Sequence, residues 1–163
     1  MNSKTRYLLI LACSRRKCSD IGLLSALDRY DGGSYRVLRK AKREGYLAEN
    51  VDILIISAKY GLIEVSTPIA DYQQRMNSKR ASQLKSQVIQ ALKNYVREKA
   101  YSQVYVDLGQ DYSTVVEGLE DLFSGSAIIY ARGRIGERLK NLKNWLIAKS
   151  QEELSELSAK FTT

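Results

Sequence analysis

The sequence of 163 residues contains no histidine, only two cysteines and a single proline. Without histidine, the protein has no His-based triad, no histidine general base and almost none of the usual zinc ligands. The two cysteines, Cys13 and Cys18, are too few for a structural zinc site, and we do not expect a disulfide between them in the cytosol. Catalysis must therefore use carboxylates, hydroxyls, a thiol, Lys, Arg or Tyr, and we expect neither a metal nor a cofactor.

Long hydrophobic runs are also lacking. No apolar stretch approaches the ~20 residues that a membrane-spanning helix needs. The short apolar run 7–13 is followed by the basic residues Arg15, Arg16 and Lys17 rather than by a cleavage site of small residues, so we expect no signal peptide. These features predict a cytoplasmic protein without a membrane partner.

The composition is that of an ordinary globular protein, with 44% hydrophobic and 27% charged residues. The length suits one hydrophobic core. We therefore predict a single α/β domain over residues 1–150. Residues 151–163 form either an extension of the last helix or a tail.

The positive charge is concentrated in two parts of the chain. The net charge is +8, and residues 1–47 carry eleven Lys and Arg against four acids, whereas 130–149 carry six against one. If folding brings these two regions together, they form one basic face, which favours phosphate or nucleic acid as the partner. A membrane surface is disfavoured because no strongly amphipathic helix rich in Trp and Phe is present. The alternative is a basic surface with no dedicated partner.

Four segments predict β-strands: 7–13, 51–57, 103–108 and 127–131. Each is a short, nearly continuous run of apolar, β-branched or aromatic residues. Such runs are typical of strands that are buried on both faces of a parallel sheet.

Helical patterns lie between and after these strands. The clearest has apolar residues at i, i+3 and i+4 spacing, with Asn77 or Ser78 as its N-cap. The alternation of strands and helices predicts a three-layer α/β sandwich with a mainly parallel sheet of four strands, or slightly more. The helical patterns cover part of 23–48, then 78–99, 112–123 and 135–146.

Polar residues and glycines follow each expected strand. Because ligands of open α/β sheets bind beyond the carboxyl ends of the strands, these segments predict a binding site at one edge of the sheet. The candidate substrate-binding residues are Cys13, Ser14, Arg15, Lys17, Ser57, Lys59, Tyr60, Gly61, Tyr72, Arg75, Gln110, Arg132, Gly133 and Arg134.

These residues have structural as well as functional interpretations. Arg15 and Lys17 are typical of a phosphate-binding segment at a strand end, or of a solvated run of charge. Gly133 begins a Gly-x-x-Gly pattern between arginines, which suits an anion but lacks the spacing of a P-loop or a dinucleotide fingerprint. Cys13 is either a small buried hydrophobe or a reactive thiol.

Asp71 and Asp107 are the candidate catalytic carboxylates. Asp107 ends a buried strand, where an unpaired charge is costly unless it meets a cation or a ligand. Asp71 lies in a loop, where a turn or an ion pair is the structural alternative. At either position a carboxylate could orient water or stabilise positive charge on a sugar, as carboxylates do in glycoside cleavage.

Several of these segments together resemble known families. Leu11-Ala12-Cys13-Ser14-Arg15-Arg16-Lys17 is followed by Tyr30-Asp31-Gly32-Gly33-Ser34-Tyr35-Arg36, by Ser57-Ala58-Lys59-Tyr60-Gly61-Leu62-Ile63, and by Asp71-Tyr72-Gln73-Gln74-Arg75-Met76. This succession resembles a small uncharacterised domain family of bacteria and their phages. The Ser-x-x-Tyr-Gly-Leu and Tyr-x-x-x-Met spacings are similar to those of YaaA-type peroxide-stress proteins. The pattern is more distantly similar to a domain of archaeosine synthase, which works on a modified base in tRNA.

The resemblance covers residues 7–76, and the remainder only by strand order. It implies an α/β fold and binding to DNA, in a chain much shorter than the YaaA-type proteins. The matched positions are Ser14, Lys17, Ser57, Tyr60, Gly61, Tyr72 and Met76.

Two functions fit these patterns. The first is a nucleic-acid- or nucleotide-directed protein, with the N-glycosidase reaction on a nucleobase as its candidate chemistry. The arginines and Lys17 then hold phosphate, and Tyr60 or Tyr72 stacks on the base. The second is a DNA- or RNA-binding module of the YaaA type, without turnover and linked to stress response. Thiol chemistry at Cys13 is a third hypothesis.

Overall fold

The chain folds around a mainly parallel sheet of five strands, as a computed structural model of residues 4–162 shows. Strands β1 (Tyr7–Ala12), β3 (Val51–Ser57), β6 (Gln103–Asp107) and β7 (Ala127–Tyr130) are parallel to one another. Strand β4 (Gly61–Glu64) pairs antiparallel with β3, and the order across the sheet is β4-β3-β1-β6-β7. The four predicted strands are confirmed to within one residue.

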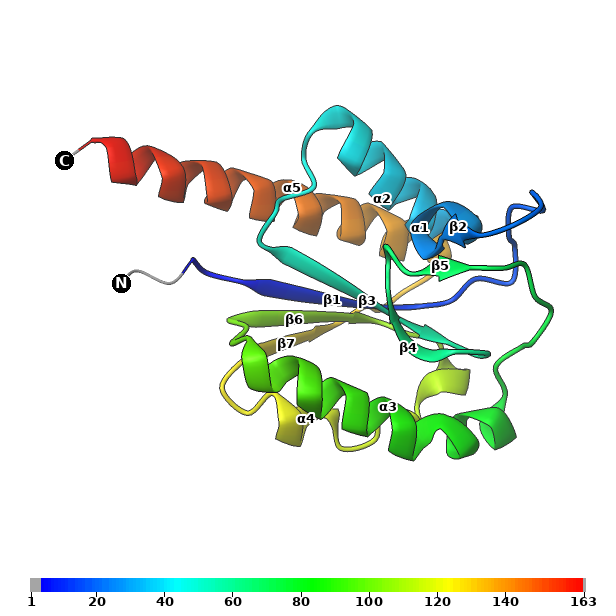
Figure 1. Cartoon of the computed structure of the whole chain (residues 1–163). Helices are drawn as coiled ribbons and strands as arrows, with labels where there is room; N and C mark the ends of the chain where they lie inside the picture. The colour runs from blue at the N-terminus through cyan, green and yellow to red at the C-terminus, as the bar shows by residue number, and fades with distance from the viewer. Residues whose placement is uncertain (1–3, 163) are drawn as a thin grey trace.

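Helices cover both faces of the sheet (Figure 1). Helices α2 (Gly33–Glu44) and α5 (Ile135–Phe161) pack together on one face. Helix α3 (Ser78–Glu98) and the short α4 (Leu119–Leu122) lie on the other. The predicted three-layer α/β sandwich is confirmed. In the described part of the chain, no helix combines the length and the apolar character needed to cross a membrane.

Strand β1 lies at the centre of the sheet and contributes to both halves of the core. Tyr7, Leu9 and Leu11 pack on the side of α2 and α5. Leu8 and Ile10 point to the opposite side, toward α3. Because both faces are covered, the strand needs apolar residues at every position, which explains its continuous hydrophobic run.

Helix α3 begins where its sequence predicts. The side chain of Asn77 accepts a hydrogen bond from the backbone N–H of Arg80 at 2.8 Å, so Asn77 is the N-cap. The buried positions of the helix repeat every three or four residues along one face, as expected of an amphipathic helix. They are Ala81, Leu84, Val88 and Leu92.

The antiparallel strand β4 was not predicted from the sequence. The chain turns after β3 and returns along it, with Gly61 at a φ of +74° opposite Ser57. A left-handed backbone of this kind favours glycine, so Gly61 permits the tight turn. A second, two-stranded sheet is also new: β2 (Leu24–Ser25) pairs with β5 (Pro68–Ile69), next to the single turn of helix α1 (Ala26–Arg29).

The predicted helix over 112–123 is wrong as one continuous element. The chain forms a 3₁₀ turn, η1 (Gln110–Tyr112), then irregular turns, and reaches α4 only at Leu119. Gly118, at a φ of +86°, lies just before α4 in a conformation that interrupts a right-handed helix.

Asp52 on β3 joins three elements at the amino end of the sheet. Its carboxylate accepts hydrogen bonds from Arg6 at 2.6 Å and from the Tyr101 hydroxyl at 2.7 Å, and Lys99 lies 3.4 Å away. Burial alone would raise the pKa of Asp52, but the bonds from Tyr101 and Arg6 outweigh it, so the pKa lies below its ordinary value.

We expect Asp52→Asn to lower the free energy of unfolding at pH 7 by about 2 kcal/mol. Because the pKa is lower in the folded protein, the ionised carboxylate stabilises the fold above the unfolded-state pKa. That contribution is lost as the pH falls through the folded-state pKa. Urea unfolding of both proteins at pH 7 and at several values below about pH 4 measures this. A stability difference that stays constant with pH would contradict the assignment.

Candidate functional site

The carboxyl ends of β1 and β6 form the point at which the chain changes direction across the sheet. The connection after β1 leads into α2 on one face, whereas the chain after β6 leads into α4 on the other (Figure 1). Open α/β sheets bind ligands in the crevice at such a switch point. Here Cys13 and Ser14 follow β1, and 108–112 follow β6.

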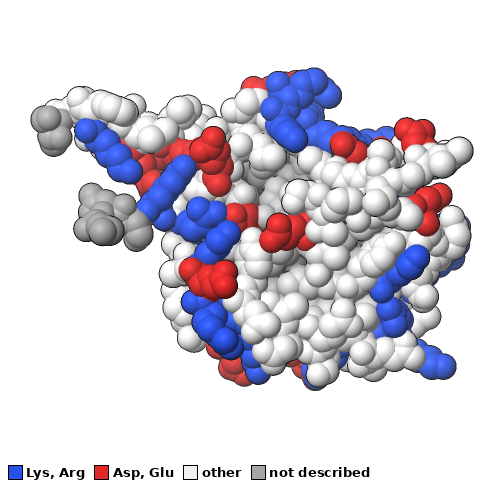
Figure 2. All heavy atoms as spheres, in the orientation of Figure 1, with Lys and Arg blue, Asp and Glu red and all other residues white. Residues whose placement is uncertain are grey.

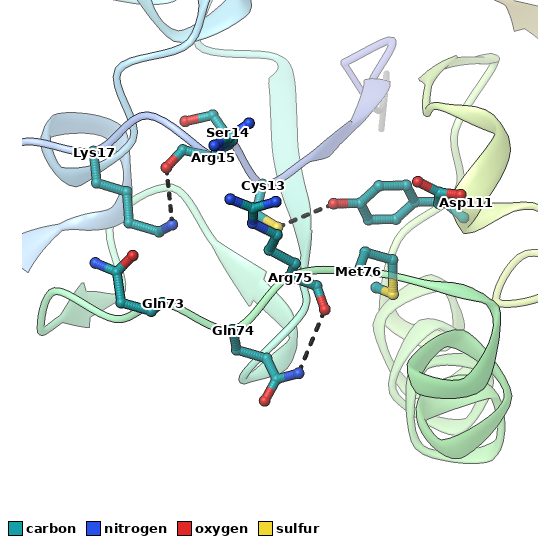
Figure 3. A pocket seen from close by; sticks show the side chains of 10 residues that line it. Cys13, Ser14, Arg15, Lys17, Gln73, Gln74, Arg75, Met76 and Asp111 are labelled. Carbon is teal, nitrogen blue, oxygen red and sulfur yellow. Dashed lines mark hydrogen bonds between the residues drawn. The ribbon is translucent and has the colours of Figure 1, made fainter.

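A cavity of about 320 Å³ opens beside this point. The segment after β1, the segment before α3 and the turn η1 form its walls (Figure 3). We call it the Cys13 cavity. Five predicted site residues line it, which are Cys13, Ser14, Arg15, Lys17 and Arg75. The other lining residues are Gln73, Gln74, Met76, Asp111 and Tyr112.

Three cationic side chains converge on the Cys13 cavity: Arg15, Lys17 and Arg75. None of the three forms an ion pair with a carboxylate of the described residues, whereas Arg6 and Arg138 do. Unpaired cations at one cavity favour an anionic ligand.

Lys17 is the most enclosed of these cations. Its Nζ lies 4.4 Å from the centre of the Tyr72 ring and donates to the carbonyl of Arg15 at 3.3 Å. The pKa of Lys17 is lowered, chiefly by burial of its ammonium group. The charge of the nearby Arg75 adds to this lowering, whereas Cys13 and Asp71 oppose it. An anionic ligand would relieve the repulsion between Lys17 and Arg75.

The sulfur of Cys13 faces the same cavity and contacts two polar groups. The Tyr112 hydroxyl lies 3.1 Å from Sγ (Figure 3). The backbone N–H of Ala58 donates to Sγ at 3.4 Å. The thiol is half-buried. Cys13 is therefore part of the lining that a ligand would touch, and is not sealed inside the core.

A smaller cavity of about 180 Å³ lies on the other side of Cys13 and Ser14, and we call it the Asp107 cavity. Asp107 is buried and forms an ion pair with Arg138 of α5. Arg138 also donates to the carbonyl of Leu108 at 3.4 Å. The charge of Asp107, a predicted catalytic carboxylate, is therefore balanced by a cation of the protein rather than by a ligand. Asp107 does not line the Cys13 cavity.

Ser57 and Tyr72, both predicted to bind substrate, lie in a buried cluster of hydroxyl groups. The Tyr30 and Tyr72 hydroxyls are 2.6 Å apart, and the Ser57 hydroxyl lies 3.2 and 3.0 Å from them. Ser57 also accepts from the backbone N–H of Tyr60 at 3.1 Å. Burial raises the pKa of Tyr30 to about 12. The hydroxyls are bonded to one another and fix the turn after β3. The Tyr72 ring itself is buried, with Lys17 over it, so it has little open surface on which a base could stack.

Of the other predicted residues from this turn, Lys59 is exposed, Tyr60 is half-buried and Gly61 is buried. Tyr60 packs edge-on against Tyr72 with ring centres 5.5 Å apart, and Lys59 reaches over the Tyr60 ring at 5.2 Å. Gly61 has the structural role described above. None of the three lines the Cys13 cavity.

Like the residues of the turn after β3, five further predicted residues lie outside both cavities. The exposed carboxylate of Asp71 accepts a hydrogen bond from the backbone N–H of the next residue, Tyr72, at 2.9 Å, and it lies in an irregular segment where the described residues show neither the turn nor the ion pair that was its structural alternative. The others are exposed as well, in η1 or in the loop between β7 and α5. They are Gln110, Arg132, Gly133 and Arg134.

Sequence reasoning missed four residues of the Cys13 cavity: Gln73, Gln74, Asp111 and Tyr112. The two glutamines stand between the predicted Tyr72 and Arg75, so the same segment already pointed to them. Asp111 and Tyr112 follow the third predicted strand, where the strand-end rule applies, but only Gln110 of that segment was selected, and Tyr112 was assigned to the start of the predicted helix.

The two basic regions are neighbours, because α2 packs against α5. Figure 2 shows Lys and Arg gathered over α2, whereas acidic and basic residues are interspersed along the far end of α5. Part of the charge of α2 is neutralised, since Arg36 and Arg39 both pair with Asp31. On this face the molecule has local basic clusters rather than one continuous basic surface.

The fold and the cavity define a three-layer α/β domain with a cationic cavity at the carboxyl edge of its sheet. The chain belongs to a family of unknown function, DUF6884, whose model matches residues 8–144. It is similar in structure to the protein in "Crystal structure of AF0587, a protein of unknown function", with a TM-score of 0.52 and 19% identity. The similarity covers 87% of this chain and 44% of that one, so this chain spans less than half of that neighbour's length. No curated protein matches the sequence.

Proposed function

We propose that the protein binds a nucleotide, free or within a nucleic acid strand, with a phosphate in the Cys13 cavity. The observation that carries this proposal is the convergence of Arg15, Lys17 and Arg75, without carboxylate partners among the described residues, at the switch point of the sheet. Guanidinium and ammonium groups are the usual protein partners of phosphate.

The remaining lining suits the rest of a nucleotide. Gln73 and Gln74 offer amide donors and acceptors for a base or a sugar. Met76 supplies a polarizable apolar side chain against which a base can pack. A cavity of about 320 Å³ has the size of a small-molecule site. The cytoplasmic location and the YaaA-type resemblance expected from the sequence are compatible with this ligand and remain part of the proposal.

The N-glycosidase reaction requires a carboxylate beside the sugar. Asp111 is the carboxylate that lines the Cys13 cavity, so it replaces Asp71 and Asp107 as the candidate for this role. In the reaction water adds to C1′ of the sugar, the bond from C1′ to the base breaks, and the base leaves with a proton. Binding without turnover is the alternative function of the same cavity.

The test measures binding of mononucleotides, single-stranded DNA, duplex DNA and RNA at two salt concentrations. We expect Arg15→Ala and Arg75→Ala each to lower the affinity for the preferred ligand about 10- to 100-fold, through loss of a charge-assisted hydrogen bond. On duplex DNA, each lost phosphate contact should reduce the salt slope by about 0.9. Lys93→Ala is the matched control, because Lys93 is exposed on α3 and lies outside both cavities.

Mass spectrometry of the same samples decides between the two functions of the cavity. A released base that disappears with Asp111→Asn, while binding persists, supports the glycosidase. Binding with no product supports the module. A product that persists with Asp111→Asn but disappears with Cys13→Ser supports thiol chemistry instead. If Arg15→Ala and Arg75→Ala bind every nucleotide and nucleic acid as the unchanged protein does, the proposed phosphate site is wrong.

A further inference from the structure

The segment after β1 is fixed against the start of α2. The Ser14 hydroxyl accepts a hydrogen bond from the backbone N–H of Gly32 at 3.2 Å. The backbone N–H of Asp31 donates to the carbonyl of Arg16 at 2.9 Å. Because Ser14 also lines the Cys13 cavity, the wall of that cavity continues directly into α2.

Three arginines share one carboxylate at this junction. Asp31 forms ion pairs with Arg16 at 3.3 Å, with Arg36 at 2.9 Å and with Arg39 at 2.7 Å. One negative charge cannot neutralise three positive ones, so the junction keeps an excess of positive charge. The side chains of Arg16 and Arg36 are 72% and 53% exposed, so an anion from solution can reach them.

Exposed cations continue along α2 from this junction. Arg36, Lys40 and Arg43 follow one another at spacings of four and three residues, which places them on one stripe of the helix. Figure 2 shows Lys and Arg side chains gathered over this helix. Residues 31–44 carry five Lys and Arg against two acids. The pair between Lys40 and Glu44, at 3.9 Å, is an exposed one that neutralises little of this charge.

We propose that the nucleotide in the Cys13 cavity belongs to a single-stranded nucleic acid, whose next phosphates bind Arg16 and then the stripe of Arg36, Lys40 and Arg43. This inference rests on the proposed function and names its substrate class. Cations that recur at regular intervals beside a phosphate site suit a ligand whose phosphates recur as well. A free nucleotide would contact the cavity alone and leave the stripe without a ligand.

The length of the stripe matches a few nucleotides. Arg36 and Arg43 are separated by about 10 Å along the helix axis. A stacked strand has one phosphate per ~3.4 Å, so the stripe spans roughly three phosphates. With the nucleotide in the cavity and a phosphate at Arg16, the protein contacts about five nucleotides. The strand is single, because a base that enters a cavity of about 320 Å³ must leave its partner and its stack.

The affinity for nucleoside 5′-monophosphates and for DNA and RNA single strands of increasing length tests the proposal. We expect the affinity to rise at least about tenfold from one to about five nucleotides, and only slightly beyond that. Lys40→Glu combined with Arg43→Glu should lower the affinity for the longer strands about 10- to 100-fold and reduce the salt slope by about 1.4, because two phosphate contacts are lost. The same variant should bind the mononucleotide as the unchanged protein does, which also shows that it folds.

Lys93→Glu combined with Arg97→Glu is the matched control. Both residues are exposed on α3, which covers the opposite face of the sheet (Figure 1), and the change in net charge is the same. This control should leave the affinity for the longer strands within about twofold, since distant exposed charges are screened by salt. An equal loss in the two double variants overturns the proposal, because binding then follows the net charge alone. Equal competition by polyglutamate also overturns it, because the stripe then accepts any acidic chain.

Failure of this inference is distinguishable from failure of the proposed function. If mononucleotides bind as tightly as every strand, or duplex DNA as tightly as single strands, while Arg15→Ala weakens them all, the phosphate site is correct and the single strand along α2 is wrong. If the α2 variant weakens strand binding but Arg15→Ala and Arg75→Ala do not, the strand binds outside the Cys13 cavity. Both the proposed function and this inference are then wrong.

Discussion

Replacing Arg29 by methionine should lower the free energy of unfolding by about 3–5 kcal/mol. Arg29 has no exposed surface, although it carries a charge. Its guanidinium donates to several backbone carbonyls and so fixes the loop after Lys17 against β5. The acceptors are Cys18 at 2.7 Å, Asp20 at 2.9 Å, Gly22 at 2.6 Å and Ile69 at 3.4 Å. Methionine would fill much of the volume but would leave these carbonyls without donors.

Urea unfolding of Arg29→Met measures the loss, and Arg43→Met on the exposed side of α2 is the control. The control should change the free energy of unfolding by less than about 0.5 kcal/mol, since Arg43 lies at the surface. Equal effects of the two substitutions would mean that the buried bonds of Arg29 contribute nothing. Because this loop begins directly after Lys17, the Arg29 variant should also loosen the wall of the Cys13 cavity to which Lys17 belongs.

The parallel strands could be predicted from the sequence because burial on both faces leaves a visible trace. Leu8, Leu9 and Ile10 are all fully buried. A strand with one face in water would instead alternate apolar and polar residues. Helix α3 could be predicted because its cap, Asn77, and its apolar spacing are both local signals. Strand β4 is different, since its pairing with β3 depends on a turn through Gly61 that only the folded chain specifies.

The candidate site was only partly predictable for a related reason. The rule that sites lie at strand ends correctly grouped Cys13, Ser14 and Lys17 at one cavity. The same rule selected Ser57 beside them, although its hydroxyl is consumed by internal partners. A sequence shows which polar groups reach the edge of a sheet, but not which of them find a partner within the protein. That depends on contacts such as the one between Ser57 and Tyr72, which the chain makes only on folding.

The effect of replacing Asp107 or Arg138 on stability should likewise depend on whether the other member of their ion pair is present. We expect Arg138→Met to lower the free energy of unfolding by about 3 kcal/mol, because it leaves the buried carboxylate of Asp107 unpaired. Combining it with Asp107→Leu should recover most of that loss, since a buried ion pair can be replaced by apolar side chains at little cost. Urea unfolding of the two single variants and the double variant measures the coupling between the two residues.

The same variants separate a structural Asp107 from a catalytic one. If the pair serves the fold, the stable double variant should bind nucleotides like the unchanged protein and release base at the same rate. If Asp107 instead acts on a substrate, stability returns in the double variant while turnover stays lost. We expect the first result, because the carboxylate faces Arg138 in the Asp107 cavity and does not line the cavity that holds the unpaired cations. If the loss of stability in the double variant equals the sum of the losses in the two single variants, the ion pair does not couple the two residues.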